Sequence, residues 1–162
     1  MKTESETDKH TACSRQWWPC IALLLVLILP CSALAELGGD VASVQADQAH
    51  MKGIRRLAST AAYTLHQIQT PSGTIVREYV SPAGKVFGVA WQGPWLPDLR
   101  QLLGSYFEPY KQAAQARHTG HGPLRVEVPG LVAHSAGHMR SFVGNAYIPD
   151  LLPSGVHPED IR

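Results

Sequence analysis

The sequence predicts an α+β fold, in which an antiparallel β-meander sheet has one long amphipathic helix packed on a face. Three observations support this prediction. Short apolar runs separated by turn residues fill residues 62–91, a helical pattern follows in residues 97–117, and alternating segments return in residues 124–148. An order of strands, one helix and further strands is typical of α+β domains.

The first three predicted strands occupy residues 62–69, 74–80 and 85–91. Turn sequences rich in proline and glycine separate them, which is typical of consecutive antiparallel strands. In the second strand Glu78 alternates with apolar residues, and successive side chains of a strand point to opposite faces. We interpret Glu78 as a member of a cross-strand charge pair, either with Lys85 or with the neighbours of Arg77.

The predicted helix begins at Pro97, a residue suited to the first helical position, and Asp98 follows where the positive end of the helix dipole favours an acid. Apolar residues then recur every three or four positions and form one wide stripe. They are Leu99, Leu102, Leu103, Tyr106, Phe107 and Tyr110. Pro109 has no backbone N–H to donate to Ser105, so we expect a kink or a break there, with the helix resuming to Arg117.

Further strands are predicted at residues 124–128, 131–135 and 138–143, with a turn at Ala136-Gly137. Residues 60–149 are therefore expected to form a single α+β domain. Residues 36–59 show weak periodicity, and we interpret them as an N-terminal extension or linker that either begins a strand near residue 40 or wraps the domain surface. Residues 150–162 contain prolines and a glycine, which predicts an irregular C-terminal tail.

Residues 1–35 are predicted to be a signal peptide. A polar leader precedes an apolar run from Ile21 to Leu29, and Ala33-Leu34-Ala35 has the small-x-small form that signal peptidases cleave. The run is shorter than the roughly 20 residues that span a bilayer, so we favour cleavage after Ala35 over an uncleaved N-terminal anchor. The expected location is the periplasm or the exterior, with no stable membrane span after cleavage.

Charge and cysteine content restrict the chemistry of the remaining chain. Residues 36–162 contain 11 Lys and Arg and 10 Asp and Glu, and this near-neutral balance gives no electrostatic reason to expect nucleic acid as a partner. All three cysteines lie within residues 1–35, so the predicted mature chain has neither a disulfide nor a thiol nucleophile. The sequence contains no cofactor-binding motif, and we expect no cofactor.

His134 and His138 are the most suggestive pair for metal chemistry. Two histidines at this spacing share a helix face and, with a glutamate, bind zinc. Here the segment is predicted to be strand and turn, where four residues separate the two by about 13 Å, and no third ligand is evident. Ser105 lies within a predicted helix rather than on the sharp turn that exposes a catalytic serine. The sequence therefore favours a non-enzymatic protein, with a hydrolase or metal-binding protein using His134 and His138 as the alternative.

Four surface positions are predicted to contribute to binding: Arg77, Trp95, His138 and Arg140. Trp95 follows a Gly-Pro turn, where large aromatic residues either line a groove for a glycan or peptide or cap the core. Exposed strand edges offer a second mode, in which a partner adds a strand to the sheet. We expect the partner to be a protein or another component of the cell envelope, and the sequence leaves its identity and the oligomeric state open.

Several sequence blocks resemble one family of exported proteins. They are the leader end at Ala33-Leu34-Ala35, GTIVREYV from Gly73, GKVF from Gly84, WQGP from Trp91, PDLR from Pro97, GHMR from Gly137, GNAYIP from Gly144 and LPSGV from Leu152. In this order, over about residues 34–162, they are similar to small exported proteobacterial proteins catalogued as domain of unknown function 2844. The resemblance implies a secreted or periplasmic protein of a Gram-negative bacterium, with no assigned activity, ligand or functional residues. The 20 residues before the apolar run exceed the usual leader of such proteins, which points to Met1 as a misassigned start.

Overall fold

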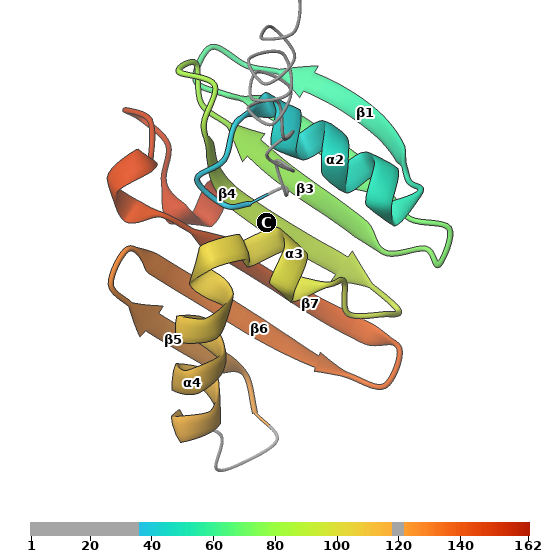
Figure 1. The fold of residues 1–162 in the computed structure, drawn as a ribbon, viewed down its shortest axis with the longest axis vertical. Helices are drawn as coiled ribbons and strands as arrows, with labels where there is room; N and C mark the ends of the chain where they lie inside the picture. Colours follow the sequence, from blue (N-terminus) through green and yellow to red (C-terminus); the bar gives the residue numbers. More distant parts are fainter. Residues whose placement is uncertain (1–35, 118–121) are drawn as a thin grey trace, which may run out of the picture. The chain divides into compact units, whose positions relative to one another are not determined.

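The computed structural model describes residues 36–117 and 122–162 (Figure 1). Residues 1–35, predicted above to be the signal peptide with its cleavage site at Ala35, lie outside the described residues. The described residues all belong to one compact unit. Within the described ranges, no helix is long and apolar enough to cross a membrane.

Seven antiparallel strands of the described chain form one sheet with the order β1-β2-β3-β4-β7-β6-β5. Their bounds are β1 Ile54–Ser59, β2 Thr64–Gln69, β3 Ile75–Val80, β4 Val86–Gly93, β5 Leu124–Val128, β6 Leu131–His138 and β7 Ser141–Tyr147. Consecutive strands form two meanders, and β7 of the second pairs with β4 of the first. The predicted α+β class with an antiparallel sheet is confirmed.

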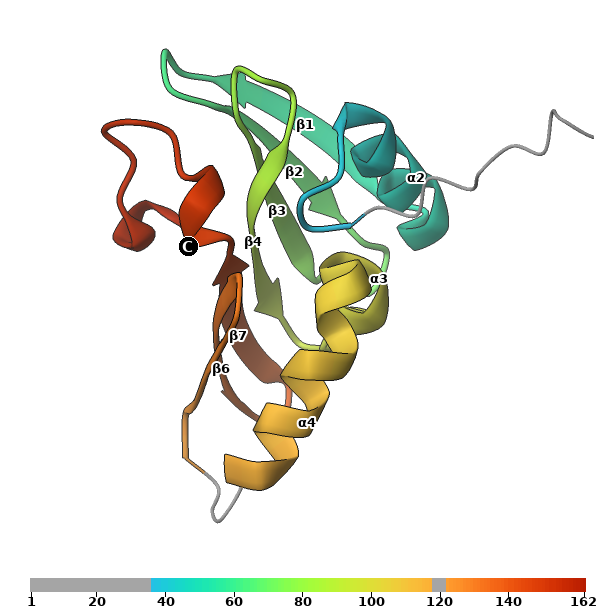
Figure 2. The same ribbon diagram turned by 60° about the vertical axis from the view of Figure 1, so that its left-hand side comes forward.

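Helices cover one face of the sheet, and the C-terminal segment covers part of the other (Figure 2). The helices are α2 Val41–Met51, α3 Leu99–Leu103 and α4 Phe107–Arg117, and short 3₁₀ turns lie at Gly104–Tyr106, Pro149–Leu151 and Pro158–Asp160. We call the two sides the helix face and the tail face. Both are apolar in the middle of the sheet, because β4 is buried along most of its length.

Two core clusters correspond to these two faces. On the helix face, α3 and α4 pack against the strands through residues that include Val89, Trp91, Leu102, Leu103, Val126 and Leu131. On the tail face, Val156 and Ile161 of the C-terminal segment pack with Tyr79, Phe87 and Tyr147. The hydroxyl of Tyr79 donates to the backbone oxygen of Arg162 (2.9 Å) and accepts from its backbone N–H (3.1 Å). The segment predicted to be an irregular tail is therefore irregular but closes the core.

The helical region departs from the sequence prediction at two points. The expected kink at Pro109 is wrong, because Pro109 lies in the first turn of α4, where backbone N–H groups have no helical partner to lose. The helix breaks instead at Gly104, whose φ of 52° disfavours other residues. Glu36 occupies the space that a side chain at Gly104 would fill. Asp98 caps α3 by accepting from the backbone N–H of Arg100 (2.9 Å), so Pro97 precedes the helix.

Residues 36–59, interpreted above as an extension or linker, instead supply a helix and a strand. Asp40 caps α2, and its carboxylate accepts from the backbone N–H of Ala42 (2.9 Å). Strand β1 pairs with β2 along its whole length and forms one edge of the sheet. The turn expected at Gly137 is also displaced: β6 continues to His138, and the chain reverses at Met139 and Arg140.

Candidate functional site

Two loops at one end of the sheet lie side by side because their strands are paired. Gly93 at the end of β4 pairs with Phe142 of β7, and His138 at the end of β6 pairs with Ser141 of β7. The loop that follows β4 therefore lies next to the tip of the β6–β7 hairpin (Figure 1). The hydroxyl of Thr74 fixes the first loop by donating to the backbone oxygen of Trp95 (2.8 Å).

Apolar side chains on these loops remain exposed. Trp95 is 58% exposed, Leu96 47% and Met139 90%, and Phe142 is partly buried beside them. We call these four residues the apolar end surface. Large apolar side chains that gather on a surface are typical of interaction sites, whereas isolated ones are common.

Two adjoining hollows lie in the apolar end surface and share Leu96, Met139 and Phe142 as walls. One has a volume of about 500 Å³ and extends towards Leu124 and Ser135, and the other, of about 440 Å³, lies against Trp95. Both volumes fall within the range of roughly 300–1,000 Å³ that small-molecule pockets occupy. The surface is therefore concave enough to receive protruding side chains of a partner.

Arg140 and His138 line the hollows, and among the residues that the structure describes no acidic side chain does. The guanidinium of Arg140 is positively charged. Arg140 has a φ of 64°, a left-handed conformation that non-glycine residues seldom adopt. Because Arg140 lines the same hollow as Trp95 and Met139, the hairpin tip places a guanidinium group beside the apolar end surface.

Three of the four predicted binding residues meet at this end of the sheet. Trp95, His138 and Arg140 line the two hollows. Arg77 does not, because it lies in β3 opposite Ala90, on the tail face. Leu96 and Met139 were not predicted. Their positions beside a Gly-Pro loop and at a hairpin tip, where exposed apolar residues are common, are the signal that could have found them.

His134 and His138 do not converge. Both belong to the uninterrupted strand β6, where four residues span about 13 Å. Nδ1 of His134 lies 3.1 Å from the side-chain oxygen of Asn145. Among residues 36–117 and 122–162, no group of three or more His, Cys, Asp or Glu side chains is placed to hold a metal ion.

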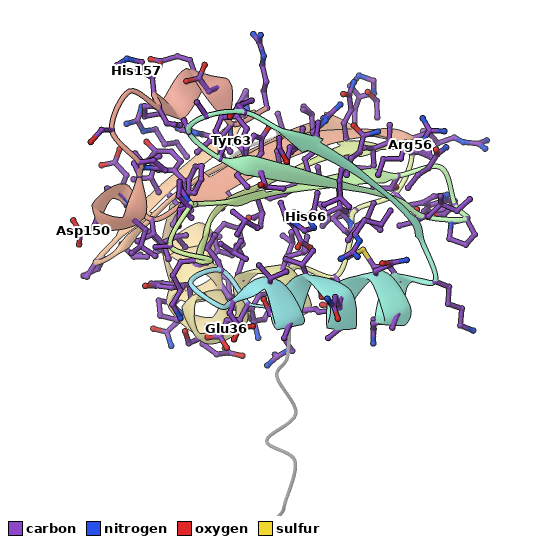
Figure 3. All side chains as sticks on the ribbon, turned by 90° about the horizontal axis from the view of Figure 1, so that it is seen from above. Glu36, Arg56, Tyr63, His66, Asp150 and His157 are labelled. Carbon is purple, nitrogen blue, oxygen red and sulfur yellow. The ribbon has the colours of Figure 1, made fainter. Side chains whose placement is uncertain are left out.

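A second chemically notable group lies in the interior between α2 and the sheet. Asp47 of α2 and Glu78 of β3 are each only 2% exposed, and their carboxyl groups hydrogen-bond to each other. His66 of β2 lies directly opposite Glu78 and points from the sheet towards α2 (Figure 3). Gln101 of α3 donates its side-chain N–H to Asp47.

Burial controls the proton affinity of these groups. Burial, with the charge of Asp47 next in importance, raises the pKa of Glu78 to about 10. Burial also raises the pKa of Asp47, against hydrogen bonds that favour its carboxylate. Burial and the neighbouring charge of Arg55 lower the pKa of His66. At neutral pH, Glu78 therefore carries a proton and His66 is uncharged.

Glu78 was interpreted from the sequence as a member of a cross-strand charge pair, and this is wrong, because it is buried and lies opposite His66. It faces the core because it lies two residues from both Val76 and Val80, so all three side chains point to the same buried face of β3. That spacing was visible in the sequence. Asp47 and His66 gave no such signal, since neither lies in a recognisable motif. All three side chains are buried, where a substrate cannot reach them. The structure therefore does not support a catalytic role for this group.

Comparison with known proteins places the chain in a family. A family model described as a protein of unknown function (DUF2844) matches residues 33–161. No curated protein matches the chain, and no solved structure matches it. Because the match covers residues 33–161 of a chain of 162 residues, the protein belongs to this DUF2844 family of unknown function.

Proposed function

We propose that the protein is an exported, non-enzymatic binding protein that docks a protein partner of the cell envelope on its apolar end surface. The observation that carries the proposal is the exposure of three large apolar side chains, Trp95, Leu96 and Met139, on adjoining loops. Trp, Met and Arg are enriched at protein interfaces, and Trp and Arg dominate their binding energy.

The charge of the surface favours one class of partner. Arg140 gives the lining of the hollows a positive charge, and no carboxylate of residues 36–117 or 122–162 lines them. Complementary charge at the rim of an interface accelerates association and suppresses wrong partners. The expected partner segment therefore presents apolar side chains next to an aspartate or glutamate.

Export to the envelope is supported by the leader rather than by the fold. Residues 1–35 combine basic residues, an apolar run and a small-x-small end, the features of a cleaved signal peptide. The location of the partner in the periplasm or at an envelope surface follows from that export. The hydrolase or metal-binding alternative has no matching observation, because His134 and His138 are held apart on one strand.

Site-specific photo-crosslinking tests this proposal. A photoreactive phenylalanine analogue replaces Met139 in the protein expressed from the full chain, and the matched control replaces Ile54, another exposed apolar residue, on edge strand β1. We expect one protein adduct from position 139 that is absent from position 54 and weakened by Arg140→Glu. No adduct from position 139, or the same adducts from both positions, would contradict the proposal.

A lipid partner gives a different result in a parallel experiment. The purified protein is sedimented with vesicles of phosphatidylethanolamine and phosphatidylglycerol. Co-sedimentation that is lost in Met139→Ser and retained in Ile54→Ser would replace the protein partner by a membrane surface. We expect the unchanged protein and both variants to remain in the supernatant.

A further inference from the structure

We propose that helix α2 is a detachable cover of the sheet, held closed by a proton shared between Asp47 and Glu78, so that each opening of the cover releases that proton. This inference is independent of the proposed binding partner. It assigns a conformational role to the interior group of acids that the apolar end surface leaves unexplained.

Few apolar side chains of α2 pack against the sheet. The helix buries three side chains, those of Ser43, Val44 and Asp47, of which just Val44 is apolar, and Met51 at its end is partly buried against the same core. A helix normally packs through an apolar stripe three to four residues wide per two turns. The contact of α2 with the sheet therefore depends to an unusual degree on Asp47.

Asp47 connects α2 to two other elements. Its carboxylate accepts from the side chain of Gln101 in α3 and shares a hydrogen bond with Glu78 in β3. Two ionised carboxylates in such a contact would repel each other, so the contact persists only while one of them is protonated. Loss of the proton converts the hold into a repulsion.

The charged and titratable groups around the pair come from every element that meets there. They are His50 on α2, Arg55 on β1, His66 on β2 and Asp98 at the start of α3. The charge of Arg55 favours the carboxylate of Glu78, but burial and the charge of Asp47 outweigh it. The closed arrangement therefore keeps the proton across the neutral range of pH.

The polar layer under α2 is also incompletely satisfied. Four of its buried side-chain atoms have no hydrogen-bond partner among the described residues: Arg55 Nη1, His66 Nδ1, Glu78 Oε1 and Gln101 Oε1. Each such atom recovers hydrogen bonds with water when the layer opens. Segments with weak apolar packing open locally at a smaller free energy than the whole fold. Opening would uncover Ile68 and Val76, which belong to the same core cluster as Val44.

Proton linkage gives the opening a defined pH dependence. In the open state Asp47 and Glu78 are solvated and return towards the ordinary pKa of a carboxyl group, whereas the closed state holds the pKa of Glu78 near 10. Between these two limits, opening releases one proton. The opening constant therefore rises about tenfold for each unit of pH.

Hydrogen exchange read by mass spectrometry tests the proposal on protein purified after expression of the full chain. Exchange of the α2 amides is measured at several values of pH between 6 and 9 and corrected for the chemical exchange rate of each peptide. The amides of β4 and β7 report opening of the whole fold. Glu78→Gln mimics the protonated acid, and Glu159→Gln, at an exposed position in the C-terminal segment, is the matched control.

We expect the protection of α2 to fall about tenfold per unit of pH in the wild type and in Glu159→Gln, and to be independent of pH in Glu78→Gln. Protection of α2 that is flat in the wild type would overturn the proposal, and so would an unchanged slope in Glu78→Gln. Protection of α2 equal to that of β4 and β7 at every pH would also overturn it, since the whole fold would then be opening; global unfolding releases the same proton, so the two classes of amide are distinguished by the size of their protection. If Glu78→Gln does not fold, the wild-type slope and the lower protection of α2 relative to β4 and β7 decide the question.

Discussion

Glu78 lies directly opposite His66 on the paired strands β2 and β3, and both side chains are buried beneath α2. Neither residue carries a charge at neutral pH, because burial raises the pKa of Glu78 to about 10 and lowers the pKa of His66. The interior of this end of the sheet is therefore polar but nearly uncharged apart from Arg55 and Asp47. This arrangement leads to the first prediction.

Glu78→Gln should make the protein more stable than the wild type at neutral and alkaline pH. The pKa of Glu78 is raised from an ordinary value of 4.5 to about 10 in the folded state, so its contribution is fully favourable below pH 4.5 and is lost as the pH rises towards 10. Glutamine has no proton to lose. We expect the variant to gain about 5 kcal/mol at pH 8 and to equal the wild type near pH 4.

Urea denaturation at pH 4, 6 and 8 measures this difference. Unfolding free energies that differ by a constant amount at all three values of pH would show that Glu78 does not titrate as the structure implies. Glu159→Gln, which removes an exposed carboxylate, should follow the wild type throughout.

Tyr79→Phe should loosen the C-terminal segment. The Tyr79 hydroxyl makes two hydrogen bonds with the backbone of Arg162, and the loss of a buried pair of this kind costs about 1–2 kcal/mol. Thermal unfolding and proteolysis of residues 149–162 report the effect. Tyr63→Phe removes a hydroxyl from the ring that packs against Tyr79 and should change the C-terminal segment little. Equal effects of the two variants would contradict the assignment.

Gly144→Ala should destabilise the centre of the sheet. A side chain at Gly144 would meet the ring of Trp91 and, at 2.6 Å, the backbone oxygen of His134. Overpacking of this kind typically costs about 1–3 kcal/mol. Gly122→Ala is the control, because nothing lies within 4 Å of the added atom there, and its free energy of unfolding should stay within about 0.5 kcal/mol of the wild type. Two variants of equal stability would show that the close approach to Trp91 is relieved without cost.

Zinc should not distinguish the wild type from a variant that lacks His134 and His138. The two histidines lie about 13 Å apart along β6, too far to share an ion. Thermal shift with increasing zinc measures this, with both residues changed to alanine. Stabilisation of the wild type by several degrees, absent from the double variant, would restore the metal-binding alternative.

The sequence predicted the sheet well where turn chemistry and apolar alternation agree. The turns between β2 and β3 and between β3 and β4 contain proline and glycine, and all three strands were expected. Strand β1 was missed because it lies at an edge, and five of its six residues are exposed, so no apolar alternation marks it. Helix α2 was missed for a related reason, since Ser43 and Asp47 are two of the three side chains it buries.

The interaction surface could be predicted only in part. Trp95, His138 and Arg140 were named from local sequence, but their convergence depends on the pairing of β4 with β7, two strands that are distant in the chain. Arg77 was grouped with them, but it lies on the tail face, and a single strand pattern does not reveal which face the C-terminal segment covers. The Asp47–Glu78 contact depends in the same way on a helix that the sequence did not reveal.

The most direct test of the binding proposal is the affinity for the partner that photo-crosslinking from position 139 identifies. Calorimetry or surface binding compares the wild type with Trp95→Ala and with the control Ile54→Ala, which removes an exposed apolar side chain from the edge strand β1. We predict that Trp95→Ala weakens binding at least about tenfold and that Ile54→Ala leaves it unchanged. Equal affinity in all three proteins would contradict the claim that the apolar end surface is the docking site.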